Sequence, residues 1–319
     1  MIAAISKKSC QKITAIISFC TNDLRFLKAC VESACLFCEQ IIVCVSDHFF
    51  DGTLEDLACL EWIYQRYPTC TFIEFAYDPN APYGFPGTVL PEDIPCRYHW
   101  HDASRLVALY FLNKNTEYAL FLDVDEIFDP IAFQTWLEGF DYKNYAALRF
   151  ASYWYFRKSS YQAMSWPDSA LLIKRSFLNP DLFLDPDERM GVFFKIKGKK
   201  MREVLGLDGL PMVHHYSWVR SKQEMLKKAA SWAHHWERNW LGLIEEEFSR
   251  EFEGEDFVRY YRYKTVEERF DPLKETDLPF SLAPVSYSDH IQNLKTFAHV
   301  TRVDSHEIFR RDLKMRFEI

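Results

Sequence analysis

The sequence predicts an α/β fold in which helices flank a mixed, largely parallel sheet. In the first half of the chain, β-branched apolar segments alternate with segments of helical periodicity, which is typical of βαβ units. In the second half, strand-like segments dominate and clear helices are fewer, so we expect a mixed sheet there. Hydrophobic residues make up 48% and charged residues 26% of the chain, a balance that allows a large buried core.

Each strand expected in the first half is an apolar run closed by polar residues. The first, at 13–19 (ITAIISF), ends in Thr21, Asn22 and Asp23, which suit the start of a helix. Pro130 suits the first turn of a later helix, and the Pro- and Gly-rich segment 78–95 should be a loop. The expected strands are 13–19, 41–45, 71–75 and 118–122, and the expected helices are 24–38, 54–67, 102–112 and one that begins at Pro130.

In the second half we expect strands first and helices last. The strands are 145–156, 170–173 and 212–218, and residues 221–247 have strong helical periodicity. Trp232, Trp236 and Trp240 recur at helical spacing there, which predicts one packed helix face. Together these features predict a domain at 10–220, which carries the sheet, and a mainly helical extension at 221–319.

Charge and cysteine content narrow the class of protein. A formal net charge of -8 argues against nucleic acid as the main partner, because phosphate neutralisation needs a dominant basic face. The nine cysteines are an odd number and several lie in apolar runs, so we expect reduced thiols and a cytoplasmic protein. No apolar run approaches the length of a signal peptide core or a membrane span.

The strongest chemical feature is YALFLDVDEIFD, an apolar strand that ends in Asp123 and Asp125. Side chains alternate along a strand, so these two carboxylates share one face and can reach one cation. Hard oxygen ligands suit Mg²⁺ or Mn²⁺, which bridge phosphate oxygens and neutralise a leaving diphosphate. An isolated DxD pattern is weak evidence, because acidic turns at strand ends are common.

In context, the sequence resembles the GT-A glycosyltransferases, particularly the family 2-like group, over approximately residues 12–220. In that group the first strand ends in a polar turn, as ISFCTND does here, and the second runs into a DGT-containing motif, here DHFFDGT at 47–53. The resemblance implies a Rossmann-like mixed sheet and a nucleotide-diphosphate-sugar donor. Asp47 would contact the nucleobase or ribose, although the sequence departs from the family pattern at His48 and Phe49.

The resemblance also implies roles for residues on either side of the DxD motif. Arg105, on the helix before the metal strand, matches an arginine of the family and would bind the donor. A late histidine would be a further metal ligand, and Lys222 would touch the diphosphate. His214 and His215 both qualify, but strand alternation turns them to opposite faces, so at most one coordinates and we prefer His215.

Transfer with inversion would also need a carboxylate that takes the proton of the acceptor hydroxyl. Asp168 is the first candidate, and Asp187 with Glu188 is the reserve. His234 and His235 are expected on the helix 221–247 as packing or acceptor-side residues.

The function expected is therefore transfer of a sugar, from a UDP-sugar by preference, to a glycan, lipid-linked or protein acceptor, with Mn²⁺ or Mg²⁺ as cofactor. The basic segment 195–202 (KIKGKKMR) could add peripheral contact with a membrane. Two alternatives stay open. FLDVDEI also fits the first motif of haloacid dehalogenase-like phosphatases, in which the first aspartate is a nucleophile, and a binding module without turnover would keep the same fold.

Overall fold

The structure, a computed structural model, describes residues 12–76, 104–183, 188–232, 234, 237–270, 279 and 281–303. Within these ranges, twelve strands join in one sheet. The strands are β1 (Ile13–Phe19), β2 (Gln40–Ser46), β3 (Thr71–Phe75), β4 (Tyr118–Asp123), β5 (Glu126–Phe128), β6 (Ala147–Phe156), β7 (Lys158–Ala163), β8 (Asp168–Lys174), β9 (Lys200–Val204), β10 (Val213–Trp218), β11 (Tyr263–Thr265) and β12 (Val300–Val303). The helices are α1 (Leu24–Ala34), α2 (Leu57–Arg66), α4 (Pro130–Gly139), α5 (Glu188–Lys195), α6 (Lys222–Ser231), α7 (Trp240–Glu247) and α8 (Tyr287–Asn293).

The centre of the sheet is parallel and one side is antiparallel. Strands β12, β3, β2, β1 and β4 run parallel in that spatial order, and β8 and β6 follow β4 with alternating direction. The predicted fold class, a Rossmann-like mixed sheet flanked by helices, is confirmed. Because β1, β2 and β4 are parallel, their carboxyl ends meet at one edge, where ligands of such sheets bind.

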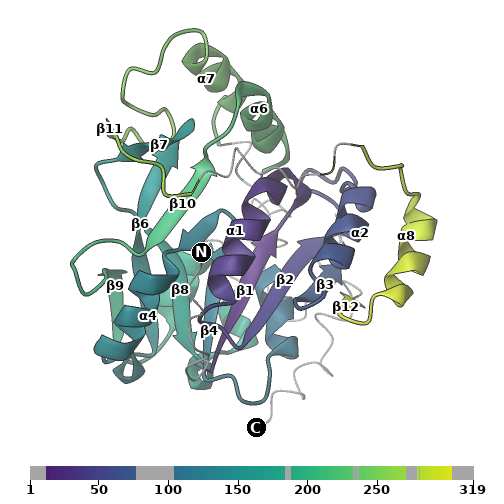
Figure 1. Ribbon diagram of the computed structural model, residues 1–319, viewed down its shortest axis with the longest axis horizontal. Helices are drawn as coiled ribbons and strands as arrows, with labels where there is room; N and C mark the ends of the chain where they lie inside the picture. Colours follow the sequence, from purple (N-terminus) through teal and green to yellow (C-terminus); the bar gives the residue numbers. More distant parts are fainter. Residues whose placement is uncertain are drawn as a thin grey trace, which may run out of the picture.

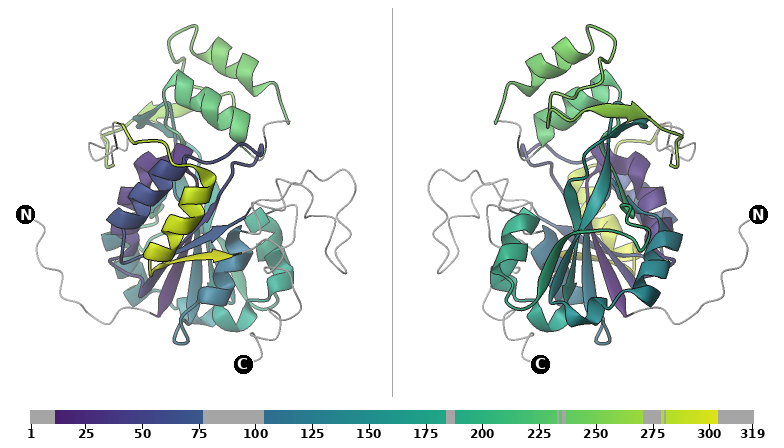
Figure 2. Two further views of the ribbon diagram at one scale, coloured as in Figure 1. Left: turned by 90° about the vertical axis from the view of Figure 1, so that its right-hand side faces the viewer. Right: turned by 90° about the vertical axis from the view of Figure 1, so that its left-hand side faces the viewer.

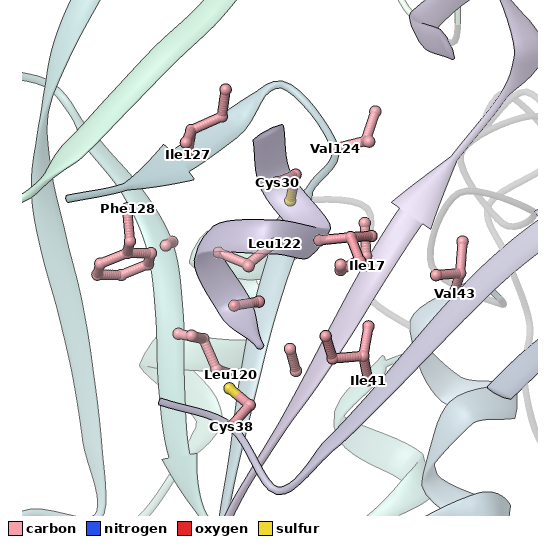
Figure 3. Close-up of a cluster of buried hydrophobic side chains, with 14 of the residues drawn as sticks. Ile17, Cys30, Cys38, Ile41, Val43, Leu120, Leu122, Val124, Ile127 and Phe128 are labelled. Carbon is pink, nitrogen blue, oxygen red and sulfur yellow. The ribbon is translucent and has the colours of Figure 1, made fainter. Parts of the chain in front are cut away.

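Apolar side chains of the central strands pack on both faces of the sheet, and helices cover both (Figures 1 and 2). On one face, alternate residues such as Ile17, Val43 and Leu122 pack against α1, α2 and α4 (Figure 3). On the other face, Ile16 and Ile42 pack against the helical residues 104–108 and against α5. The alternation of buried faces along each strand explains why these strands are apolar throughout.

Helix α4 begins where the sequence predicts. The Asp129 carboxylate accepts hydrogen bonds from the backbone N–H of Ile131 and Ala132 at 3.1 and 3.0 Å, and Pro130 occupies the first turn. Trp136 of this helix is fully buried among aromatic rings. The cap and this buried ring fix the helix against the sheet next to the Asp125 turn.

The single helix expected at 221–247 is wrong. Helix α6 ends at Ser231 and α7 begins at Trp240, with Trp232 and His234 in the connection between them. The three tryptophans therefore do not share one helix face, and Trp236 and His235 lie outside the described residues. Helices α6 and α7 instead pack side by side on β6 and β10, beyond the carboxyl edge of the parallel strands (Figure 1).

The C-terminal part returns to the sheet. Strand β12 pairs in parallel with β3, and α8 packs beside α2. The buried imidazole of His290 lies between Glu61 and Glu74, at 3.0 and 2.9 Å, and these carboxylates raise its pKa even though burial alone lowers it. Residues 221–319 thus supply two edge strands, β11 and β12, as well as helices, while the division of the chain at residue 220 stays a prediction.

The cysteines of the described core behave as small hydrophobic residues. Burial raises the pKa of Cys59 and of Cys70 to about 12, which keeps both thiols protonated at neutral pH. Cys10 and Cys96 lie outside the described residues. None of the helices in the described ranges is both long and apolar enough to cross a bilayer.

Candidate active site

A cavity of about 630 Å³ lies at the carboxyl ends of β1, β2 and β4. Its floor includes Ser18, Ser46 and Asp123, the last residues of these strands or their neighbours. Other lining residues come from α6, α7 and the segment around Val258. The parallel strands thus place the acidic turn that follows β4 at this cavity.

Asp125 is buried at the floor of this cavity, beside the side chains of His215 and Lys228. Its Oδ1 lies 3.4 Å from Nε2 of His215, and its Oδ2 lies 3.5 Å from Nζ of Lys228. Lys228 also donates to Oγ of Ser217 at 2.9 Å. Burial alone would raise the pKa of Asp125, but Lys228 and His215 hold it well below its usual range, so the carboxylate is charged.

The residues around Asp125 fit a divalent cation. Oδ1 of Asp125 is buried and accepts no hydrogen bond from the described residues. It faces Nε2 of His215 at a separation close to the roughly 3 Å between neighbouring ligands of a small ion. No cluster of three or more His, Cys, Asp or Glu suited to a metal occurs in the described ranges. Two protein ligands match a cation whose remaining positions are filled by substrate phosphates and water.

Asp123 is arranged differently from Asp125. Its two oxygens accept hydrogen bonds from Arg105 at 2.9 Å and from Arg189 at 2.8 Å. Arg189 also donates to the fully buried Glu126 at 2.6 and 2.8 Å. Asp123 and Glu126 raise the pKa of Arg189, although burial alone would lower it. Asp125, rather than Asp123, therefore presents an oxygen without a donor to the cavity.

Strand pairing explains the position of His215. Strand β10 pairs with β5 so that His215 lies opposite Glu126, and the backbone N–H of Tyr216 donates to the carbonyl of Asp125 at 2.9 Å. The neighbouring His214 points to the other face, where its Nδ1 lies 2.8 Å from the hydroxyl of Tyr155. Burial lowers the pKa of His214 to about 3, so it is a neutral core residue.

The candidate bases lie in different surroundings. Asp168 lines the cavity, but its oxygens accept from Arg202 at 2.6 Å and from the backbone N–H of Glu203 at 2.8 Å. Asp187 lies outside the described residues. Glu188 lines the cavity, with its Oε1 3.0 Å from Nε2 of His234, and its backbone φ of 50° is rare for a side-chain-bearing residue. Backbone strain of this kind is often found at functional positions.

Three residues expected at the donor, Asp47, Lys222 and Arg105, do not line the cavity. Asp47 is buried, with Oδ2 accepting from Arg302 at 2.7 Å and from Tyr287 at 2.8 Å, and its Oδ1 lies 2.7 Å from Nδ1 of His48. It is His48 that lines the cavity. Lys222 pairs with Glu245 at 2.5 Å on the outer side of α6. Arg105 is also buried behind the floor, on Asp123.

The sequence analysis missed two cations that contact the acidic turn, Arg189 and Lys228. Lys228 had a signal: Ser221 and Glu224 form a capping box, which fixes where α6 begins. Counting along α6 places Lys228 on the same buried face as Met225. No sequence signal indicated Arg189, because it contacts Asp123, a residue 66 positions earlier in the chain.

At least three of the five basic residues in the segment 195–202 make contacts within the fold. Lys199 lies over the ring of Tyr145, Lys200 lies over Phe193, and Arg202 pairs with Asp168. These contacts leave less positive charge for a membrane surface than the sequence suggests, and peripheral membrane contact stays a prediction.

Comparison with known proteins finds similarity only among solved structures. No protein-family model and no curated protein matches the sequence. The chain is similar to glycosyltransferase GlyE of Streptococcus pneumoniae, with 12% identity over 76% of this chain and 64% of that one and a TM-score of 0.36. It is also similar to the galactosyltransferase LgtC in complex with donor and acceptor sugar analogs, with 11% identity over 72% of this chain and 95% of that one and a TM-score of 0.35. A third similar structure is 4-diphosphocytidyl-2C-methyl-D-erythritol synthase of Anaerococcus prevotii, with 11% identity over 69% of this chain and 98% of that one and a TM-score of 0.38.

Proposed function

We propose that this chain is a metal-dependent glycosyltransferase that moves a sugar from a nucleotide-diphosphate donor, UDP-sugar by preference, to an acceptor hydroxyl. One observation carries the proposal. The buried Asp125 carboxylate, with an oxygen that receives no hydrogen bond in the described structure, faces His215 at the floor of a cavity large enough for a nucleotide sugar.

Asp125 and His215 would hold the cation in this proposal. An imidazole beside one carboxylate favours Mn²⁺ over Mg²⁺, because Mg²⁺ prefers oxygen ligands. The bound ion supplies charge neutralisation for the diphosphate that leaves the sugar. Lys228 fixes the Asp125 carboxylate from one side, and its own charge adds to the attraction for phosphate.

Arg105 and Arg189 have a positioning role in this scheme. They hold Asp123 by both oxygens, which sets the course of the turn that leads to Asp125. The backbone N–H of Asp123 donates to Glu126 at 3.0 Å and closes the same turn. Asp123 therefore supports the cation site and adds negative charge near it, with Asp125 as the direct ligand.

Direct displacement at the sugar needs a group that accepts the proton of the acceptor hydroxyl. Asp168 has an arginine on one oxygen and a backbone N–H on the other, so we assign this role to Glu188. His234 bridges Glu188 and Glu237, at 3.0 and 2.6 Å. Burial lowers the pKa of His234, but the two carboxylates raise it overall. The imidazole of His234 holds the Glu188 side chain at the cavity.

Replacing Glu188 by Gln should therefore slow sugar transfer by about 10²- to 10⁴-fold, the usual contribution of a general base. The amide keeps the shape of the side chain but does not accept a proton. Affinity for UDP with Mn²⁺ should stay close to that of the parent protein. Asp168→Asn is the matched comparison, and transfer that survives in Glu188→Gln but is lost in Asp168→Asn would reverse the assignment.

The phosphatase alternative gains no support from the site. It would use Asp123 as a nucleophile, which requires a carboxylate oxygen that can approach phosphorus. Both oxygens of Asp123 are instead bound by guanidinium groups.

The proposal is tested by incubating the full chain with UDP-glucose, UDP-galactose and UDP-N-acetylglucosamine, with Mn²⁺ or with EDTA. We expect slow, Mn²⁺-dependent release of UDP from at least one donor, because water can replace the acceptor. Inorganic phosphate from p-nitrophenyl phosphate would identify a phosphatase instead. Tight UDP binding without turnover of any donor would identify a binding module.

A further inference from the structure

Two arginines, Arg238 and Arg259, line the part of the cavity wall next to Trp240 and Val258. The guanidinium of Arg238 lies 5.2 Å from the ring centre of Trp240, and that of Arg259 lies 5.0 Å from the ring centre of Trp154. Both tryptophans are buried and line the same cavity. Contacts with two buried tryptophan rings thus help to place both guanidinium groups at the cavity.

The loop that carries Arg259 is held rigidly. The carboxylate of the buried Asp256 accepts hydrogen bonds from the backbone N–H of Val258, Arg259 and Tyr261 and from the hydroxyl of Tyr263. Arg238 reaches across to this loop and donates to the carbonyl of Val258 at 3.3 Å. The backbone of this loop and the guanidinium group of Arg238 are therefore held in place by hydrogen bonds within the protein.

Within the described part of the chain, the other arginines and lysines that line the cavity have a carboxylate neighbour, whereas Arg238 and Arg259 have none. Arg149 lies near Asp168, Arg189 binds Asp123, and Lys228 lies near Asp125. No carboxylate of the described residues lies within 4 Å of Arg238 or Arg259, whose hydrogen bonds and ring contacts involve only uncharged groups. A pair of exposed guanidinium groups in a cavity is suited to an anion with two or more acceptor oxygens.

We propose that this wall is the acceptor subsite and that the acceptor is a sugar bearing an anionic group, a phosphate or a carboxylate. This inference rests on the proposed transferase function and adds the class of its second substrate. Arg238 and Arg259 bind the anionic substituent, and the acceptor hydroxyl then reaches Glu188, which lines the same cavity.

The test is calorimetric titration of the full chain with three probes of one ring size: glucose 6-phosphate, glucuronate and glucose. Each is measured with and without UDP and Mn²⁺. We expect at least one anionic probe to bind about tenfold or more tightly than glucose. The preference between phosphate and carboxylate identifies the acceptor anion. In the double variant Arg238→Gln, Arg259→Gln, the anionic probe and glucose should bind with about equal affinity. The melting temperature of the variant shows whether it is folded.

Arg250→Gln is the matched control, because Arg250 is exposed and pairs with Glu246 and Glu253 away from the cavity. It should leave the preference unchanged. Equal affinity of the parent protein for all three probes would overturn the inference, as would a double variant that loses UDP affinity as strongly as affinity for the anionic sugar. Failure of UDP release in the donor assay is a separate result, since the sugar titrations without UDP do not depend on it.

Discussion

Replacing Asp125 by Asn is expected to reduce Mn²⁺-dependent UDP release by about 10² to 10³-fold, the effect of several kcal/mol of charge stabilisation in the transition state. The amide preserves the volume of the side chain but removes the charge that attracts the cation. It also leaves Lys228 without its carboxylate neighbour, so the variant site repels Mn²⁺. The measurement is the initial rate of UDP release as a function of Mn²⁺ concentration.

Asp141→Asn serves as the control for this substitution, because Asp141 is an exposed residue whose carboxylate accepts from Asn144 far from the cavity. Its rate and its half-saturating Mn²⁺ concentration should match those of the parent protein. If Asp125→Asn kept both values while Asp123→Asn lost them, the direct ligand would be Asp123. If neither substitution altered them, the acidic turn would not bind the cation and the proposed function would fall with it.

The parts of the fold that the sequence predicts well are those set by local periodicity. Strands β1, β2 and β4 are apolar on both faces because helices cover both, so each is a continuous apolar run. Helix α4 carries its own start signal in Asp129 and Pro130. The acidic turn after β4 follows from the same strand, which is why Asp125 could be placed from the sequence.

The parts that the sequence does not reveal depend on contacts between distant residues. Asp47 sits in the motif expected at a nucleotide, but its carboxylate is held by Arg302, 255 positions later. That contact exists because β12 adds to the edge of the sheet, and β12 is too short and polar to be identified as a strand from its pattern alone. In the same way, the break between α6 and α7 falls where tryptophan spacing favours a continuous helix.

Arg189 binds both the buried Glu126 and the acidic turn of the site. Of the substitutions considered, its replacement should lower the free energy of unfolding most. Glu126 is fully buried and has hydrogen bonds from Arg189 and from the backbone N–H of Asp123. Arg189→Met removes the cation and leaves that carboxylate buried without its partner. Breaking a buried pair from one side costs about 3 to 5 kcal/mol, so the free energy of unfolding in urea should fall by about that amount.

The double variant Arg189→Met, Glu126→Gln separates the charge effect from the packing effect. If the loss arises from an uncompensated carboxylate, removing that charge should recover part of the stability, and the coupling between the two sites should exceed about 1 kcal/mol. Arg250→Met, in an exposed ion pair, should change unfolding little. Additive effects at 189 and 126 would mean that Arg189 acts through packing alone. Arg189 also binds Asp123. We therefore expect Arg189→Met to lower the rate of Mn²⁺-dependent UDP release at urea concentrations at which the variant is still folded.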